Sequence, residues 1–332
     1  MKNSGYFFLL LFLISCTTNS VTENYQKNRN KILNVVSKLH KITLGDVMIG
    51  SNARVFIIGD KLIVSDYKSY DKQMHLFNKN DYTYLTSFAQ KGKGPNEITN
   101  IGYVAVDEKR NKLYVSDHGK QKIFSYDIDS LIQDSLYVPS VKWNMDVKTF
   151  PSEYDYYSDT LSIGRVIQPI GNNDFKPVVA RINFEKKLFT LMPYEHPEIK
   201  RNRFLCASSL ESNIYVQCYN YCDLMTICSL DGKLKCNVYG PMWYDQSYKL
   251  DCFHKVIIAD NKIFALYSGK KLKISESSTM CQVFDLNGDY LYTIDFGHLT
   301  ADFCFDEDNN RLILILDDED FQFAYLNLSE LE

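Results

Sequence analysis

Carboxylate and imidazole side chains occupy equivalent positions in two segments of the chain. Val64-Ser65-Asp66 and Val115-Ser116-Asp117-His118 each end an apolar run with an aspartate, and a histidine follows the second one. Such groups can bind a metal ion or act as general acids and bases. Because an aspartate that recurs at the end of a strand usually caps a turn, we interpret Asp66 and Asp117 as structural. His118 remains a candidate ligand-binding residue.

Two clusters of aromatic residues are candidates for binding rather than catalysis. Tyr154-Asp155-Tyr156-Tyr157 lies in the least regular part of the chain, and Met242-Trp243-Tyr244 follows Gly240-Pro241. Exposed aromatic rings can stack on sugar rings or bind a protein partner. The predicted ligand-binding residues are therefore His118, Tyr154, Tyr156, Tyr157, Trp243 and Tyr244. The alternative is that the aromatic side chains fill gaps inside the fold.

Motifs for catalysis or cofactor binding are missing from the sequence. There is no Gly-x-Ser-x-Gly, no cysteine in a recognisable catalytic setting and no Cys-x-x-Cys. The acidic runs 306–310 and 317–320 lack the glycine and the terminal glutamate of an EF-hand loop. We expect no cofactor and no metal. The formal charge of −4, without a basic block, argues against nucleic acid as a partner.

The N-terminus has the features of a lipoprotein signal. Nine apolar residues, 6–14, follow Met1-Lys2, which suits a signal peptide and is too short to span a bilayer. Leu13-Ile14-Ser15-Cys16 resembles the bacterial lipobox, so Cys16 is predicted to carry the lipid that anchors the protein to a membrane. Thr17 replaces the aspartate typical of inner-membrane retention, which favours the outer membrane. The alternative is a secretory signal that happens to contain a cysteine.

The other eight cysteines all lie in the C-terminal half of the chain. An exported protein enters an oxidising compartment, where disulfides are permitted. Several of these cysteines nevertheless lie inside apolar runs, as in Phe204-Leu205-Cys206. We interpret them as small buried apolar residues, with one or two disulfides as the alternative.

A pattern of a turn followed by an apolar strand recurs six times. The copies begin their apolar runs at Leu62, Leu113, Leu161, Ile214, Ile263 and Leu312. These positions are separated by 51, 48, 53, 49 and 49 residues. In the fifth copy four short strands can be recognised, joined by Asn, Asp and Gly turns. In the second copy the fourth strand is expected at 135–138. Four strands per repeat of this length are typical of a β-propeller blade.

The ends of the chain indicate that the ring closes. The last repeat supplies three strands, and residues 41–49, ahead of the first repeat, could supply the fourth. Closure removes an unpaired sheet edge. We therefore expect an all-β fold: a six-bladed β-propeller with four-stranded antiparallel blades, closed by an N-terminal strand. The predicted domains are a signal peptide over 1–15, the lipidated cysteine and a tether over 16–39, and the propeller over 40–332.

The stretch Gln90-Lys-Gly-Lys-Gly-Pro-Asn-Glu97 could be taken for a phosphate-binding loop. Pro95 removes a backbone N–H, however, and a strand rather than a helix follows. Gly92 and Gly94 are instead expected to turn the chain from the rim of one blade to the axis of the next.

The segment Gly92-x-Gly94-Pro95-x-Glu97 and the strands after it resemble the repeat of NHL-type and TolB-like propellers. With the lipobox, the chain is similar to six-bladed propeller lipoproteins of Bacteroidetes. The resemblance implies a protein of the cell envelope. We expect a binding platform for an envelope protein or a glycan. The alternative is a metal-assisted hydrolase, lactonase or lyase, with ligands such as Asp66, Asp117 and His118 at the axial funnel.

Overall fold

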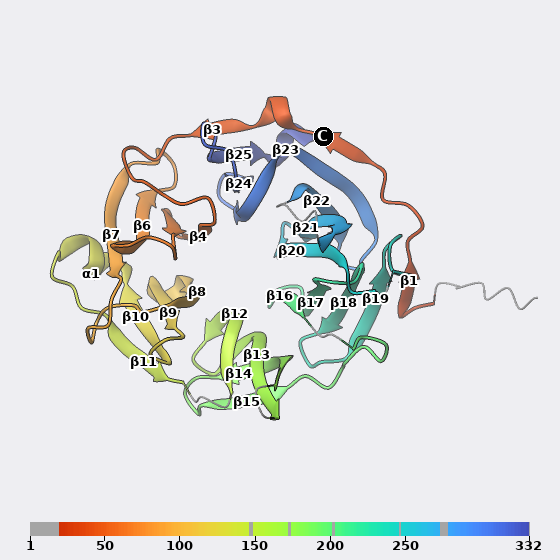
Figure 1. Cartoon of the computed structure of the whole chain (residues 1–332), viewed down its shortest axis with the longest axis horizontal. Helices are drawn as coiled ribbons and strands as arrows, with labels where there is room; N and C mark the ends of the chain where they lie inside the picture. Colours follow the sequence, from red (N-terminus) through yellow and green to blue (C-terminus); the bar gives the residue numbers. More distant parts are fainter. Residues whose placement is uncertain are drawn as a thin grey trace, which may run out of the picture.

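The protein folds into a ring of six blades around a central axis (Figure 1). The computed structural model describes residues 20–145, 149–171, 174–200, 203–245, 247–272 and 278–331. The blades are antiparallel sheets, and the first strand of each lies nearest the axis. The predicted fold class is confirmed. In the described residues no helix is long and apolar enough to cross a membrane.

The first three blades follow the four-strand scheme. Blade one contains β4 (Arg54–Ile58), β5 (Lys61–Ser65), β6 (Lys72–Asn78) and β7 (Tyr84–Gln90). Blade two contains β8 (Ile101–Asp107), β9 (Lys112–Asp117), β10 (Lys122–Asp127) and β11 (Ser140–Asn144). Blade three contains β12 (Phe150–Ser158), β13 (Leu161–Gly171), β14 (Asp174–Asn183) and β15 (Leu188–Leu191).

The remaining blades use a shared strand and strands from the N-terminus. Blade four contains β16 (Phe204–Ser209), β17 (Ile214–Tyr219), β18 (Leu224–Ser229) and β19 (Leu234–Tyr239). Blade five contains β20 (Leu250–Ala259), β21 (Lys262–Lys271), β22 (Ser278–Asp285) and the first part of β23 (Tyr290–Asp306). The second part of β23 begins blade six, which continues with β24 (Arg311–Leu316), β25 (Phe323–Asn327) and β3 (His40–Ile42).

Short helical segments connect the strands. They are α1 (Ile128–Gln133) and the 3-10 turns η1 (Val36–Lys38), η2 (Glu108–Arg110) and η4 (Leu328–Leu331). The outer strand of blade two was expected at 135–138. It lies instead at β11, because α1, capped by the Asp127 side chain on Ser130 N–H, occupies the chain directly after β10.

The hydrophobic core is divided among the interfaces between blades. Six buried clusters are present, and each joins residues of two neighbouring blades. One of them packs blade six against blade one and contains Ile313 of β24 and Leu62 of β5. A middle strand therefore has apolar contacts on both faces, which explains why Leu62, Ile63 and Val64 are all fully buried. The ring is closed by packing as well as by strand pairing.

The repeated turn residues have a conformational role. Asn111, Asn213, Asn261 and Asn310 precede the second strand of their blades, and their φ angles lie between 46° and 53°. Asparagine adopts this left-handed conformation more readily than most residues. The recurrence of Asn before the apolar run thus reflects the geometry of a tight hairpin.

Residues 20–39 form a belt along the outer edge of the ring (Figure 1). β1 (Glu23–Tyr25) pairs in parallel with β19 of blade four, and β2 (Ile32–Asn34) pairs in parallel with β23 of blade five. The chain then reaches β3, which closes blade six as predicted. The expectation of a tether is therefore wrong for residues 20–39. The outer strands β19 and β23 offer N–H and C=O groups, and β1 and β2 of the belt pair with them.

Candidate functional site

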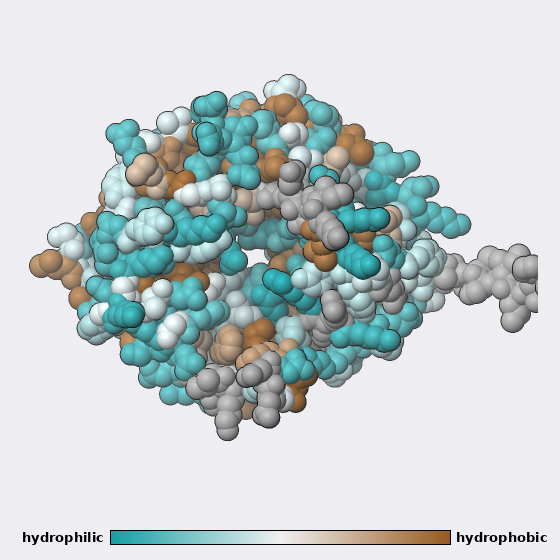
Figure 2. Space-filling model, viewed as in Figure 1, coloured by the Kyte–Doolittle hydropathy of each residue, from teal (hydrophilic) through white to brown (hydrophobic). Residues whose placement is uncertain are grey.

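A cavity of about 910 Å³ lies at the centre of the ring, and its wall is contributed by all six blades. Figure 2 shows the opening at the axis, surrounded largely by hydrophilic residues. The lining side chains follow from the topology. In an antiparallel pair, the start of the inner strand lies beside the end of the second strand, as Ile101 pairs with Asp117. Residues at these two places in each blade converge on one axial face.

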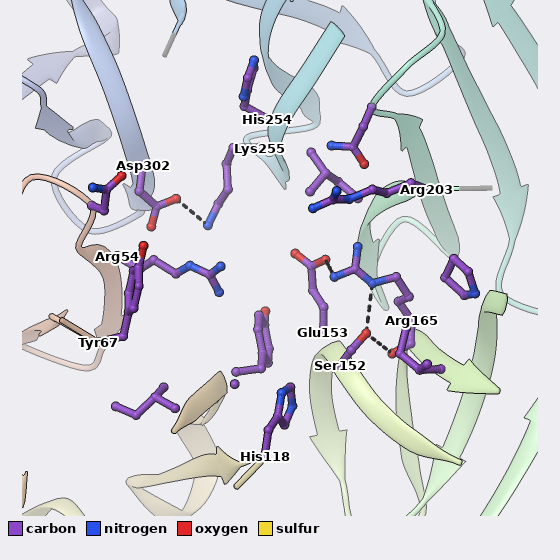
Figure 3. A pocket seen from close by; sticks show the side chains of 18 of the residues that line it. Arg54, Tyr67, His118, Ser152, Glu153, Arg165, Arg203, His254, Lys255 and Asp302 are labelled. Atoms are coloured by element: carbon purple, nitrogen blue, oxygen red, sulfur yellow. Dashed lines mark hydrogen bonds and ion pairs between the residues drawn. The ribbon is translucent and has the colours of Figure 1, made fainter. Parts of the chain in front are cut away.

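Each blade contributes at least one polar or charged side chain to this cavity, which we call the funnel (Figure 3). The charged ones are, in chain order, Arg54, Glu153, Arg165, Arg203, Lys255 and Asp302, and blade two contributes His118. Four are permanently cationic groups and two are carboxylates. The funnel therefore has an excess of positive charge, whereas the whole chain carries a formal charge of −4.

Two of the cations serve to connect blades. Lys255 Nζ lies 2.8 Å from Asp302 Oδ1, which joins blade five to blade six, and Asp302 Oδ2 accepts a hydrogen bond from Val55 N–H of blade one. Arg165 Nη2 lies 3.3 Å from Glu153 Oε2, and its Nη1 donates to Phe204 O of blade four. The positive charges of Lys255 and Arg165 are thus paired with the carboxylates of Asp302 and Glu153.

The other two cations have no carboxylate partner in the part of the chain that the structure describes. The Arg54 side chain makes no hydrogen bond or ion pair there, although its backbone belongs to the β4–β5 pair. Arg203 Nη1 donates to Tyr221 OH at 3.1 Å, and its guanidinium lies 6.0 Å from the centre of the Tyr221 ring. The two come from blades one and four, which are opposite in a ring of six. Figure 3 shows both side chains extending into the funnel.

Two histidines, His118 and His254, line the funnel. Burial lowers the pKa of His118 and of His254 below the usual histidine value. The His118 ring packs over Gly102, where an added Cβ would lie only 2.2 Å from its Nε2. That Nε2 atom is buried and has no hydrogen-bond partner in the described chain. His118, predicted as a ligand-binding residue, does lie at the axial face.

The aromatic residues predicted from the sequence are mostly not exposed. Tyr154 is 2% exposed and Tyr156 is also buried, because 150–158 is the regular inner strand β12, and alternate side chains face blade two. Tyr157 is partly buried, and its OH lies 2.8 Å from Ser208 Oγ. For Tyr154 and Tyr156 the prediction of exposed binding side chains is wrong. These rings fill the gap between blades.

The second aromatic cluster lies outside the funnel. Trp243 is buried against His196 and Tyr239, with ring centres 5.6 and 4.7 Å apart respectively, so its prediction as an exposed residue is also wrong. Tyr244 is 73% exposed but does not line the central cavity. Cys16, the predicted lipidation site, lies outside the described residues.

The two aspartates cap turns, as interpreted from the sequence. Asp66 Oδ2 accepts from Gly50 N–H at 2.8 Å, and Asp117 accepts from the N–H groups of Thr99, Asn100 and Gly119. Their carboxylates are thus used by the backbone and do not converge on the axis with His118. No group of three His, Cys, Asp or Glu side chains suited to a metal ion occurs within the described ranges.

The glycine stretch forms the joint between blades one and two. Gly94 N–H donates to Glu97 Oε2 at 2.6 Å, and Gly92 N–H donates to Ile98 O. A Cβ on Gly92 would lie 2.0 Å from Glu97 Oε2, so the carboxylate occupies the space that only glycine leaves open. The loop binds its own glutamate, consistent with a turn rather than a phosphate site.

The eight cysteines in the described chain have free thiols, and all but Cys304 are buried. Burial raises the pKa of these thiols, for example that of Cys222 to about 11. They act as small apolar residues, and the alternative of one or two disulfides is not seen in these residues.

Sequence reasoning missed the cations of the funnel, although a weak signal was available. Arg54, Arg203 and Lys255 each stand directly before a buried apolar run, at Val55, Phe204 and Val256. Arg54 and Lys255 also share one place in the repeat, eight residues before Leu62 and Ile263, whereas Arg203 lies eleven residues before Ile214, so the signal covers two of the three cations. The sequence offered no sign that Glu153 and Arg165 would join them.

Comparison with known proteins gives the family. The model of a family described as 6-bladed beta-propeller matches residues 18–223, more than half of the chain. The chain belongs to this 6-bladed beta-propeller family. No curated protein matched the sequence.

Several solved structures share the fold of this 6-bladed beta-propeller. A putative exported protein from Bacteroides fragilis NCTC 9343 has a TM-score of 0.56 and 13% identity, with 92% of this chain and 97% of that chain covered. Regucalcin, a calcium-binding protein from Agrobacterium tumefaciens, has a TM-score of 0.52 and 9% identity, covering 92% and 95%. A luciferin-regenerating enzyme has a TM-score of 0.54 and 10% identity, covering 87% and 95%. At these identities the likeness shows the fold alone.

Proposed function

We propose that this protein is a lipid-anchored component of the bacterial cell envelope whose propeller is a binding platform, with the ligand site in the axial funnel. The observation that carries the proposal is the cavity of about 910 Å³, to which all six blades contribute polar or charged side chains. Cavities of this size hold small ligands or a protruding part of a larger one. A glycan or a protein of the envelope would supply that ligand.

The lipobox supports the anchor, and the belt determines where the anchor would leave the ring. Glu23, the first residue of β1, lies seven positions after Cys16, so the lipid would lie within about 25 Å of that point. Because β1 is paired with the outer strand of blade four, the anchor would hold the ring by its rim. An axial face held in this way stays open to ligands. The lack of aspartate after Cys16 points to the outer membrane.

The anchor is tested by metabolic labelling with a palmitate analogue, followed by membrane fractionation. Full-length protein should be labelled and should sediment with the outer membrane. Cys16→Ser should abolish both, whereas Cys304→Ser, which alters the partly exposed cysteine among the described residues, should change neither. Labelling that persists in Cys16→Ser would contradict the anchor.

The binding role is tested with full-length protein in detergent, screened against purified envelope polysaccharides and envelope proteins. We expect saturable binding that Tyr67→Ala, which alters the funnel wall, weakens and that Tyr244→Ala, on an exposed loop outside it, leaves intact. Binding affected only by Tyr244→Ala would place the site elsewhere. Rapid turnover of a ligand would show an enzyme instead.

A further inference from the structure

We propose that the funnel selects an acidic oligosaccharide, with carboxylate or sulfate groups bound by Arg54 and Arg203 and with sugar rings stacked on the aromatic side chains of the wall. This inference rests on the proposed function and adds the chemical class of the ligand.

The first argument is the charge left over after the internal ion pairs are formed. Asp302 and Glu153 are each taken up by their own cation, Lys255 and Arg165. Arg54 and Arg203 remain in the funnel without a carboxylate partner in the described chain. Guanidinium groups match carboxylate and sulfate oxygens with two parallel hydrogen bonds. Two such groups facing each other across the axis favour a ligand with negative charge on at least one side.

The second argument is that both arginines adjoin buried residues of inner strands. Arg54 is the first residue of β4, between buried Ala53 and Val55. Arg203 directly precedes Phe204, which is fully buried and whose carbonyl accepts from Arg165. Only the side chains themselves need to be ordered by a ligand. A site of this kind loses little conformational entropy on binding.

The third argument concerns the rest of the wall, which suits sugar rings. Tyr67 and Phe175 line the funnel and are 39% and 55% exposed, so each offers a ring face for stacking. The residues His118 and Asn220 also line it, and their Nε2 and Oδ1 atoms are buried without a hydrogen-bond partner in the described residues. Hydroxyl groups both donate and accept, so they can satisfy such atoms. An acidic peptide would match the arginines but has fewer hydroxyls for these two positions.

The test is isothermal titration calorimetry of full-length protein in detergent with three probes. They are trigalacturonic acid, its fully methyl-esterified form, which has the same rings without charge, and a glutamate-rich hexapeptide. The variants are Arg54→Gln, Arg203→Gln and Tyr67→Ala. Arg181→Gln is the control, because Arg181 is exposed on β14 outside the funnel. Melting temperatures of all variants show that each one is folded.

The acid should bind at least about tenfold more tightly than its ester, and less tightly as salt is raised. Each funnel arginine variant should weaken binding of the acid by about tenfold to a hundredfold, while Arg181→Gln leaves it unchanged. Tyr67→Ala should weaken both sugars.

Three results would overturn the inference. Equal affinity for acid and ester, both reduced by Tyr67→Ala, would keep the funnel as a binding site but remove the charge selection. Preference for the peptide, reduced by Arg54→Gln, would make the ligand an acidic protein segment. If no probe binds at millimolar concentration, an acidic oligosaccharide is excluded, and the envelope screen with Tyr67→Ala then decides separately whether the funnel binds anything.

Discussion

Breaking the ion pair that fastens the N-terminal belt should destabilise the whole ring. Arg29 lies in the belt between β1 and β2, and its Nη1 lies 2.8 Å from Asp223 Oδ1 of blade four and 2.8 Å from Gln282 Oε1 of blade five. The side chains of Arg29 and Asp223 are 3% and 0% exposed. The guanidinium also lies 5.0 Å from the centre of the Phe284 ring. The perturbation is Arg29→Met, which keeps the volume and removes the charge.

The expected loss follows from what remains after the substitution. The Asp223 carboxylate keeps its hydrogen bonds from Met242 N–H, at 3.0 Å, and from the Tyr267 hydroxyl, but it loses its cation in a fully buried position. Removing one partner of a buried ion pair typically costs about 3–5 kcal/mol of unfolding free energy. In the double variant Arg29→Met with Asp223→Asn no charge is left unpaired, so part of the loss should be recovered.

The assay is urea-induced unfolding, followed by circular dichroism and fluorescence together. Trypsin gives a second measurement, because Lys27 and Lys31 flank Arg29 and should be cleaved once the belt detaches. Lys233→Met is the matched control, since its pair with Asp231 is exposed, and it should leave the unfolding curve unchanged. A loss below about 1 kcal/mol for Arg29→Met, with additive effects in the double variant, would refute the reasoning.

Two further predictions concern the funnel wall and its surroundings. Burial raises the pKa of Asp155 to about 6, above the 3.8 of a free carboxyl. The folded state therefore binds a proton that the unfolded state releases, so the free energy of unfolding falls as pH rises from about 4 to about 6. Asp155→Asn should therefore gain about 2–3 kcal/mol relative to the parent between pH 4 and pH 7, measured by urea unfolding at both values; an equal difference at both pH values would contradict this. Gly102→Ala should displace the His118 ring, since the new Cβ would lie 2.2 Å from its Nε2. The substitution should reduce ligand affinity with little change in melting temperature. Unchanged affinity would show that His118 does not shape the site.

Much of the fold could be read from the sequence because the information is local and repeated. A blade is about fifty residues of short strands joined by tight turns, and each turn needs a residue that accepts a positive φ, such as Asn111 or Asn261. Six copies of one local solution indicate six blades. The closing strand followed from the same reasoning, because the last repeat lacked its fourth strand.

The belt could not be found in this way. β1 and β2 are three residues each, too short for any hydrophobic period, and they form only because blades four and five offer a free outer edge. The tyrosines of β12 were misplaced for a related reason. Tyr154 and Tyr156 alternate with polar residues, which is the pattern of a strand buried on one face, but their burial depends on the neighbouring blade.

The sequence by itself thus determined the six blades and the turn-capping role of Asp66 and Asp117, since hydrogen bonds and packing within about fifty residues decide these features. It also indicated closure, because the last repeat lacked a strand that the N-terminal segment could supply, although that pairing joins opposite ends of the chain. Only the tertiary structure decided where a ligand could bind. Arg54 and Arg203 are about 150 residues apart in the chain, and they face each other because closure places blade one opposite blade four. No local pattern encodes that distance, because it results from the packing of six interfaces around the axis.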